Sequence, residues 1–140
     1  MRRLLLTTAA LAAFSLPALA RDNYAILVGA NTYPALQEQY WLKGPSNDVA
    51  LVATYLTTAA PVPFAADNVT VLADGIPGKP APTLAAIRGA FADLTAKVQP
   101  GDFVYLHFSG HGSQAPAKDP DSELDGLDEL FLPVDIGPWQ

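Results

Sequence analysis

Residues 24–29, YAILVG, form a continuous apolar run that ends at a glycine. An apolar run of this length without alternation is typical of a strand that is buried on both faces, and such strands occur mostly in parallel sheets. The following residues, 30–44, are polar and include Pro34 and Gly44, so they predict a loop. The run therefore predicts the first strand of a parallel sheet, with a loop at its carboxyl end.

Helical and extended patterns alternate along the rest of the chain. The predicted elements are a helix that starts at Ser46-Asn47-Asp48 and ends before Pro61, a strand over 68–73, a helix behind the N-cap Thr83, a strand over 102–108 and a short strand over 129–133. The β-α-β-α-β order predicts an α/β fold, a mostly parallel sheet flanked by helices. Sites in such sheets form beyond the carboxyl ends of the strands, so we expect residues 29–31 and 109–111 to lie close together.

Length and composition limit the class of protein. The 140 residues suffice for one domain with a core. The formal net charge is −6, and no Lys/Arg cluster follows Arg3, which argues against nucleic acid as a partner. The chain contains no cysteine, which excludes disulfides and thiolate metal sites within it.

The first twenty residues have the organisation of a bacterial-type signal peptide. Met1-Arg2-Arg3 is a positive segment, residues 4–16 are apolar, and Pro17 to Ala20 ends in small residues that suit a signal peptidase. The alternative is an uncleaved anchor, but the apolar run is shorter than the about 20 residues of a membrane span. We expect a signal peptide at 1–20, a domain at 21–140, export to the periplasm or medium, and no membrane attachment after cleavage.

His111 stands between two glycines directly after the third predicted strand. Imidazole exchanges protons near neutral pH, which suits general acid–base catalysis. Gly110 and Gly112 permit unusual dihedral angles and a close approach by substrate, and the Gly112 N–H is a candidate oxyanion donor. The alternative is a loop histidine on a tight turn. His107 lies within the strand, and we expect it to be a half-buried structural histidine and not a metal ligand.

Seven of the fourteen acidic residues fall within the last 22 positions. They are Asp119, Asp121, Glu123, Asp125, Asp128, Glu129 and Asp135. Carboxylates at this density suit Ca²⁺, and Asp121, Asp125 and Asp128 are the candidate ligands. An EF-hand is excluded, because the Glu required at loop position 12 is Leu132. The alternative is a solvated acidic loop.

Asp48 lies in the first turn of the predicted first helix. There a carboxylate is stabilised by the helix dipole, by roughly 0.3–1 kcal/mol, and this role alone accounts for it. Alternatively, the acid lies near a site and binds a cationic group of a substrate. Asn31, Tyr33 and Trp41 occupy the loop after the first strand, where they either line a site or pack the loop.

Four stretches resemble, in order, the caspase-like cysteine peptidases and especially their metacaspase branch. They are YAILVGANTY at 24–33, LKGPSNDVALVATYL at 42–56, VYLHFSGHGSQ at 104–114 and DGLDELFLPVD at 125–135. The resemblance implies a caspase–haemoglobinase fold and hydrolysis of peptide or protein substrates by a Cys/His dyad, with no cofactor needed for the chemistry.

The resemblance also implies roles for individual residues. His111 corresponds to the catalytic histidine, and Gly112 to the oxyanion-hole residue. Asp48 and Ser109 match the acidic pocket that selects Arg or Lys before the cut, where a carboxylate can pair with a guanidinium. Metacaspases are often activated by calcium, which supports Ca²⁺ as an activator here.

The sequence departs from the family pattern at the nucleophile. The family uses a Cys in an Asp-x-Cys motif, and in caspases this Cys follows the His by about 50 residues, beyond Gln140. We therefore expect the N-terminal part of a longer endopeptidase, with an incomplete sheet, an unpaired apolar edge and no activity on its own. The alternatives are a non-catalytic caspase-like binding or regulatory module, and an unrelated exported calcium-binding α/β domain.

Overall fold

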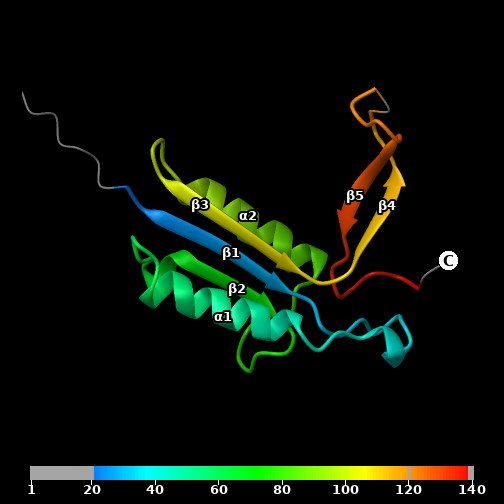
Figure 1. The fold of residues 1–140 in the computed structure, drawn as a ribbon, viewed down its shortest axis with the longest axis horizontal. Coiled ribbons are helices and arrows are strands. Elements are labelled where there is room, and N and C mark those ends of the chain that lie inside the picture. The colour runs from blue at the N-terminus through cyan, green and yellow to red at the C-terminus, as the bar shows by residue number, and fades with distance from the viewer. Residues whose placement is uncertain (1–20, 120, 139–140) are drawn as a thin grey trace, which may run out of the picture.

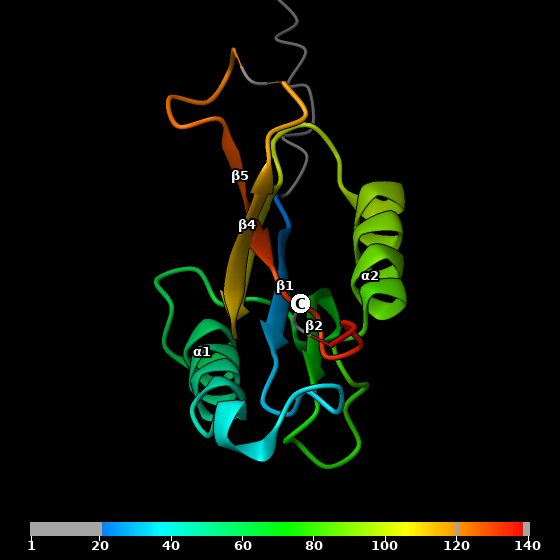
Figure 2. The ribbon, with the colours of Figure 1, turned by 90° about the vertical axis from the view of Figure 1, so that its right-hand side faces the viewer.

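The structure is a computed structural model that describes residues 21–119 and 121–138; the predicted signal peptide lies outside these residues. Three parallel strands form its sheet in the order β2-β1-β3. These strands are β1 (Asn23–Gly29), β2 (Val69–Ala73) and β3 (Phe103–Ser109). Helices α1 (Pro45–Thr58) and α2 (Leu84–Lys97) cover opposite faces of the sheet (Figures 1 and 2). The predicted α/β fold with a parallel sheet is confirmed.

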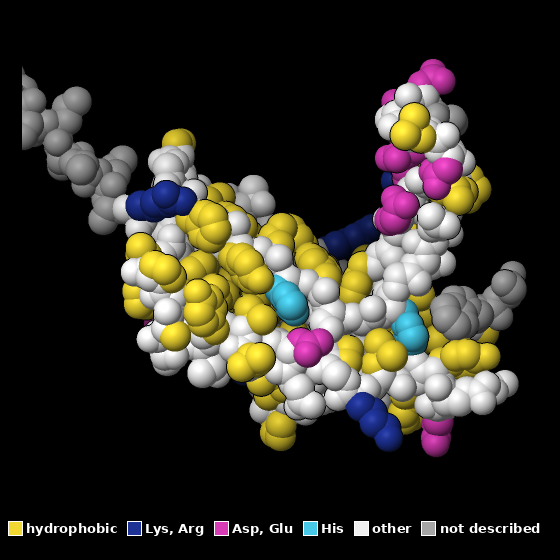
Figure 3. Space-filling view, viewed as in Figure 1, with side chains coloured by type: hydrophobic (Ala, Val, Ile, Leu, Met, Phe, Trp, Pro, Cys, Tyr) yellow, Lys and Arg dark blue, Asp and Glu magenta, His cyan; other side chains and the backbone are white. Residues whose placement is uncertain are grey.

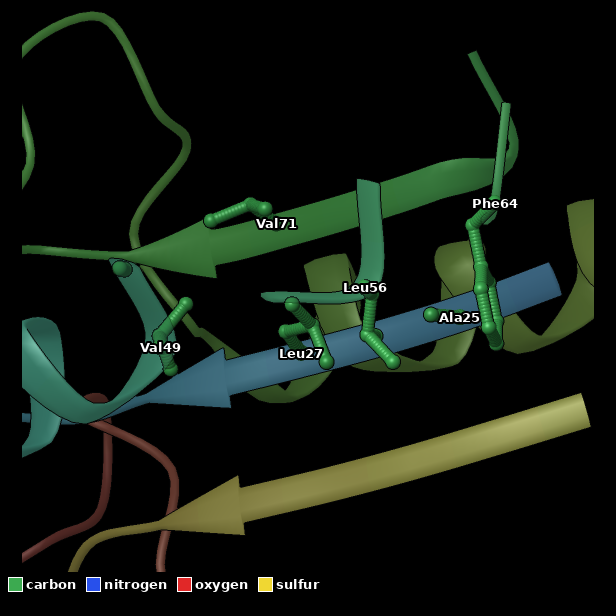
Figure 4. Close-up of a cluster of buried hydrophobic side chains, with 7 residues drawn as sticks. Ala25, Leu27, Val49, Leu56, Phe64 and Val71 are labelled. Atoms are coloured by element: carbon green, nitrogen blue, oxygen red, sulfur yellow. The ribbon is translucent and has the colours of Figure 1, made fainter. Parts of the chain in front are cut away.

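The apolar run of β1 forms the centre of the core. Ala25 and Leu27 face α1, where Val49 and Leu56 pack against them (Figure 4). The alternate residues of β1 face α2 and pack on its buried side chains. Residues 25–28 are at most 1% exposed, which explains why the run carries no polar side chain.

The two long helices begin in different ways. Thr83 caps α2 as predicted, because its side chain accepts a hydrogen bond from the Ala86 N–H at 3.1 Å. Helix α1 begins at Pro45 behind Gly44, and no side chain caps it. Ser46 is therefore not a cap, although it lies in the first turn; its hydroxyl donates to Asn31 on the preceding loop.

An antiparallel hairpin projects from the body beyond β3 (Figures 1 and 2). Its strands are β4 (Gly112–Pro116) and β5 (Leu127–Phe131), and we call residues 112–131 the arm. The predicted strand at 129–133 is found two residues earlier, and β4 was missed. The β4 sequence GSQAP has little apolar character, and every second residue of the strand is exposed. Its extended conformation depends on the pairing with β5.

Strand β3 lies at an edge of the sheet and pairs with β1 within the described part of the chain. Its exposed apolar side chains are Phe103, Val104, Leu106 and Phe108, each at least 36% accessible. Figure 3 shows hydrophobic side chains over the part of the molecule that contains the sheet, and acidic side chains on the arm. The predicted apolar edge is therefore present. No helix among the described residues is long and apolar enough to cross a membrane.

Gly29 lets α1 approach the end of β1, and this gives a first prediction. A Cβ at residue 29 would lie 2.8 Å from both the Pro45 carbonyl oxygen and Val49 Cγ2. We expect Gly29→Ala to lower the free energy of unfolding by about 1–3 kcal/mol, because backbone and core must both shift. Urea denaturation followed by circular dichroism measures the change.

Gly89→Ala is the matched control. Gly89 lies within α2, and a Cβ there meets no atom within 4 Å. Alanine should stabilise the helix by about 0.5–1 kcal/mol. Equal effects of the two substitutions would contradict the close packing of α1 on Gly29.

Candidate active site

The carboxyl ends of β1 and β3 meet at one edge of the sheet. Gly29 is the register partner of Ser109, and the Ala30 N–H donates to the Ser109 carbonyl at 2.9 Å. The first turn of α1 lies over this edge, since Gly29 is in contact distance of Pro45. The expected proximity of residues 29–31 and 109–111 is confirmed.

Asp48 and Ser109 come together at this edge from 61 positions apart in sequence. The Ser109 hydroxyl donates to Asp48 Oδ2 at 2.7 Å. The Asp48 side chain is exposed and Ser109 is half-buried, so the carboxylate is accessible from solvent while the hydroxyl orients it. This pair can bind a cationic group and hold it in a defined position.

His111 follows β3 and is held through its backbone and its ring. Its backbone N–H donates to the Tyr33 hydroxyl oxygen at 2.9 Å. Its ring Nε2 lies 2.6 Å from the Tyr40 carbonyl oxygen. A carbonyl oxygen only accepts, so we assign the proton to Nε2, and the neutral ring then carries its lone pair on Nδ1. The contact therefore selects one tautomer and one ring orientation.

Neither glycine beside His111 uses the positive φ angle that glycine permits. Positive φ angles occur within the described chain at Gly78, Gly101 and Gly126. A glycine is required at position 110 because there is no room for a side chain: a Cβ would lie 2.9 Å from both the Tyr33 hydroxyl and Phe131 Cε2.

Gly112 is the first residue of β4 and lies opposite Phe131. The Leu132 N–H donates to the His111 carbonyl, and at the other end of the hairpin the Ala117 N–H donates to the Gly126 carbonyl, both at 2.9 Å. Positions 111/132 and 117/126 therefore take the hydrogen-bonded places of the ladder, although the His111 N–H itself donates to Tyr33. In an antiparallel ladder the next pair is then a non-hydrogen-bonded pair. This register directs the Gly112 N–H away from β5, as an oxyanion donor requires.

Asp74 is a site-supporting residue that the sequence did not indicate. It follows β2 at the same edge, and its carboxylate accepts from the backbone N–H groups of Asn31 at 2.8 Å and Thr32 at 2.7 Å. The Thr32 hydroxyl also donates to it. Its position after a buried strand was the available signal, but Asp followed by Gly75 is also a common sequence in turns.

Asn31 closes the base of the loop between β1 and α1. Its side-chain oxygen accepts from the Ser46 N–H at 2.9 Å, and its side-chain nitrogen donates to the Leu42 carbonyl at 3.1 Å. The Leu42 N–H returns a bond to the Asn31 carbonyl at 2.8 Å. The loop that carries Tyr33 and Tyr40 is thus tied at both ends, which keeps both groups in place beside His111.

The predicted calcium ligands lie on the arm and are not gathered around a common point. Within the described residues, no three His, Cys, Asp or Glu side chains could hold a metal ion together. Asp125 accepts from the Leu127 N–H at 3.1 Å, and Asp128 accepts from the Lys118 N–H at 3.3 Å. Calcium binding through Asp121, Asp125 and Asp128 stays a prediction, and it would require these side chains to rearrange.

His107 lies in β3 and is half-buried, as expected. Its Nε2 is buried, and within the described structure it has no hydrogen-bond partner. Within the described residues it belongs to no group of three possible metal ligands, so its place in the fold is that of a packed strand residue.

The parallel sheet, with a histidine and the Asp48–Ser109 pair at its carboxyl edge, defines a caspase-like α/β domain. Comparison with known sequences identifies the branch. The family described as "Metacaspase, peptidase C14 domain" matches residues 23–138, so the chain belongs to the metacaspase family.

Individual relatives are similar over most of the chain. Metacaspase-4 of Arabidopsis thaliana is 36% identical over 112 residues, which cover 80% of this chain and 26% of the relative. Metacaspase-7 of the same plant is 34% identical over 114 residues, covering 81% and 27%. Metacaspase-1A of Aspergillus niger is 37% identical over 113 residues, covering 80% and 26%. The chain thus spans about a quarter of the length of these relatives.

Proposed function

We propose that this chain is the histidine-bearing part of a cysteine endopeptidase that cuts peptides after Arg or Lys. The observation that carries the proposal is the fixed imidazole of His111 on the same sheet edge as the Asp48–Ser109 pair. The chain has no cysteine of its own, so the thiol nucleophile would come from polypeptide beyond Gln140. Membership of the metacaspase family supports this reading.

In the proposed mechanism, His111 acts as general base and then as general acid. Its Nδ1 takes the proton from the thiol as sulfur attacks the scissile carbonyl, and later delivers it to the leaving amine. The Tyr40 carbonyl stabilises the imidazolium that forms between these steps, because Nε2–H donates to it. The Gly112 N–H donates to the oxyanion of the tetrahedral intermediate.

Substrate selection is assigned to Asp48. A guanidinium in front of this carboxylate would form a charge-assisted and bidentate pair, which a Lys ammonium forms with less directional preference. The Ser109 hydroxyl holds Oδ2 and so limits the orientations that the carboxylate adopts. We therefore expect Arg to be preferred over Lys, and acidic residues to be rejected.

The test is a cleavage assay with the full-length protein and peptides that differ only at the residue before the cut. Peptides with Arg or Lys should be cleaved, an Asp peptide should not, and alkylation with iodoacetamide should stop the reaction. The 140-residue chain alone should show no cysteine-peptidase activity, because it has no thiol. Cleavage that survives alkylation would refute the proposal, and absence of cleavage in the full-length protein would favour the binding module.

Two further properties are proposed on narrower grounds. Export rests on the composition of residues 1–20, and calcium activation on the seven acids between Asp119 and Asp135. Export is independent of the peptidase assignment, whereas calcium activation presupposes it.

A further inference from the structure

Tyr33 is a buried side chain in direct contact with His111. It is 0% exposed, and its hydroxyl oxygen accepts the backbone N–H of His111 at 2.9 Å. The two rings also lie next to each other, with centroids 5.0 Å apart and planes tilted by 45°. One side chain therefore contacts both the backbone and the imidazole of the same residue.

The backbone of Tyr33 is tied to the segment that holds the other side of the imidazole. The Tyr33 carbonyl accepts from the Leu36 N–H at 2.8 Å and from the indole N–H of Trp41 at 3.0 Å. Trp41 directly follows Tyr40, whose carbonyl receives the His111 Nε2–H. The Tyr33 phenol and the Tyr40 carbonyl, which both contact His111, are thus linked through the hydrogen bond from Trp41 to Tyr33. We call Tyr33, Tyr40 and Trp41 the clamp.

Gly110 shows that this arrangement is closely packed. A Cβ at residue 110 would lie 2.9 Å from the Tyr33 hydroxyl oxygen, a distance that real Cβ atoms essentially never show. The φ of Gly110 is not positive, so the glycine is required by space and not by backbone conformation. The strand end before His111 has to lie against the phenol.

The phenol is neutral at physiological pH. Burial raises the pKa of Tyr33 above its ordinary value, Asp74 raises it further, and the His111 N–H lowers it by a smaller amount than burial raises it. A neutral phenol oxygen accepts a hydrogen bond without placing a negative charge beside the imidazole. The clamp therefore positions His111 without acting as a counter-ion.

We propose that Tyr33 is a positioning residue for His111: its hydroxyl fixes the backbone at 111, and its ring fixes the imidazole against the Tyr40 carbonyl. The catalytic consequence rests on the proposed function of His111. The effect of Tyr33 on the position of the His111 ring does not rest on that function, because it concerns the geometry of the histidine in the absence of substrate.

Tyr33→Phe in the full-length protein tests the proposal, since it removes one oxygen and keeps the ring. We expect kcat for an Arg peptide to fall by about 10-fold or more, because a misplacement of 1 Å can cost about 100-fold. KM should stay within about twofold, because substrate binding is assigned to Asp48. Tyr55→Phe is the control: Tyr55 lies on α1, is half exposed and should leave both constants unchanged.

A second measurement does not need activity. Nitrogen-15 NMR of the imidazole reports the tautomer, and the exchange rate of the His111 amide proton reports its hydrogen bond. In Tyr33→Phe the amide should exchange faster and the Nε2–H tautomer should lose its dominance, while amides of β1 keep their protection. A purely structural role of Tyr33 would leave the tautomer unchanged, or would affect the whole core.

Gly110→Ala adds a test of coupling. The new methyl group would meet both the Tyr33 hydroxyl and the Phe131 ring. Tyr33→Phe relieves the first of these contacts, so the double variant Tyr33→Phe/Gly110→Ala should lose less activity than the product of the single losses. Multiplicative losses would argue against the contact. If His111→Ala is inactive but Tyr33→Phe keeps full kcat and the Nε2–H tautomer, the positioning role of Tyr33 is refuted and the proposed function stands. If His111→Ala is active, the proposed function fails instead.

Discussion

Replacing His111 by alanine in the full-length protein should lower kcat for an arginine peptide by a factor on the order of 10²–10⁴. The substitution removes the group that takes the thiol proton and returns it to the leaving amine. Asp48 and Ser109 are untouched, so KM should change far less than kcat. Steady-state kinetics with a fluorogenic peptide measures both constants.

His107 provides the matched control for this prediction, because it is the other histidine of the chain. Its Nε2 is buried, and the described structure offers it no hydrogen-bond partner, so His107→Leu replaces a poorly satisfied polar group by an apolar one. We expect this variant to keep its activity. If the two substitutions reduce kcat to the same extent, His111 is not the specific base.

The second large effect is expected at Asp48. Asp48→Asn removes the charge with little change in shape, and a hydrogen bond to a charged group contributes about 1.5–3 kcal/mol. We therefore expect kcat/KM for an Arg peptide to fall by about 10–150-fold, given that 1.4 kcal/mol is a factor of ten. The Ser109 hydroxyl still has an acceptor in the side-chain carbonyl of Asn, so the fold should persist.

Two further variants separate charge from structure. Ser109→Ala should cost less than Asp48→Asn, since it removes only the hydroxyl that orients Oδ2. Asp93→Asn, on the exposed face of α2, changes the net charge by the same amount and should not alter kcat/KM. Unchanged cleavage after Arg in Asp48→Asn, or an equal loss in Asp93→Asn, would overturn the pocket assignment.

Much of the body of the fold was predictable from local patterns. The apolar run of β1 predicted a central strand because a strand covered by helices on both faces cannot carry polar side chains. The cap of α2 was predictable because Thr83 satisfies a backbone N–H within its own turn. These signals depend on neighbours in sequence, or on burial alone.

The arm was not predictable in the same way. Strand β4 has an exposed residue at every second position and no apolar face, so its extended conformation depends on pairing with β5. The reason for a glycine before His111 was not predictable from the sequence either. The packing of Tyr33 and Phe131 requires a glycine at 110, and neither residue is a neighbour in sequence.

By itself, the sequence determined an α/β domain, the order of the three strands of its parallel sheet along the chain, and the chemical types available at their carboxyl ends. The tertiary structure alone decided which of these groups meet: Ser109 with Asp48, the His111 ring with the Tyr40 carbonyl, and Asp74 with the loop after β1. The reason is physical. Burial and helix capping act on the residue or its turn and leave a local pattern. A hydrogen bond between residues 61 or 71 positions apart depends on strand register and helix placement, which no local pattern encodes.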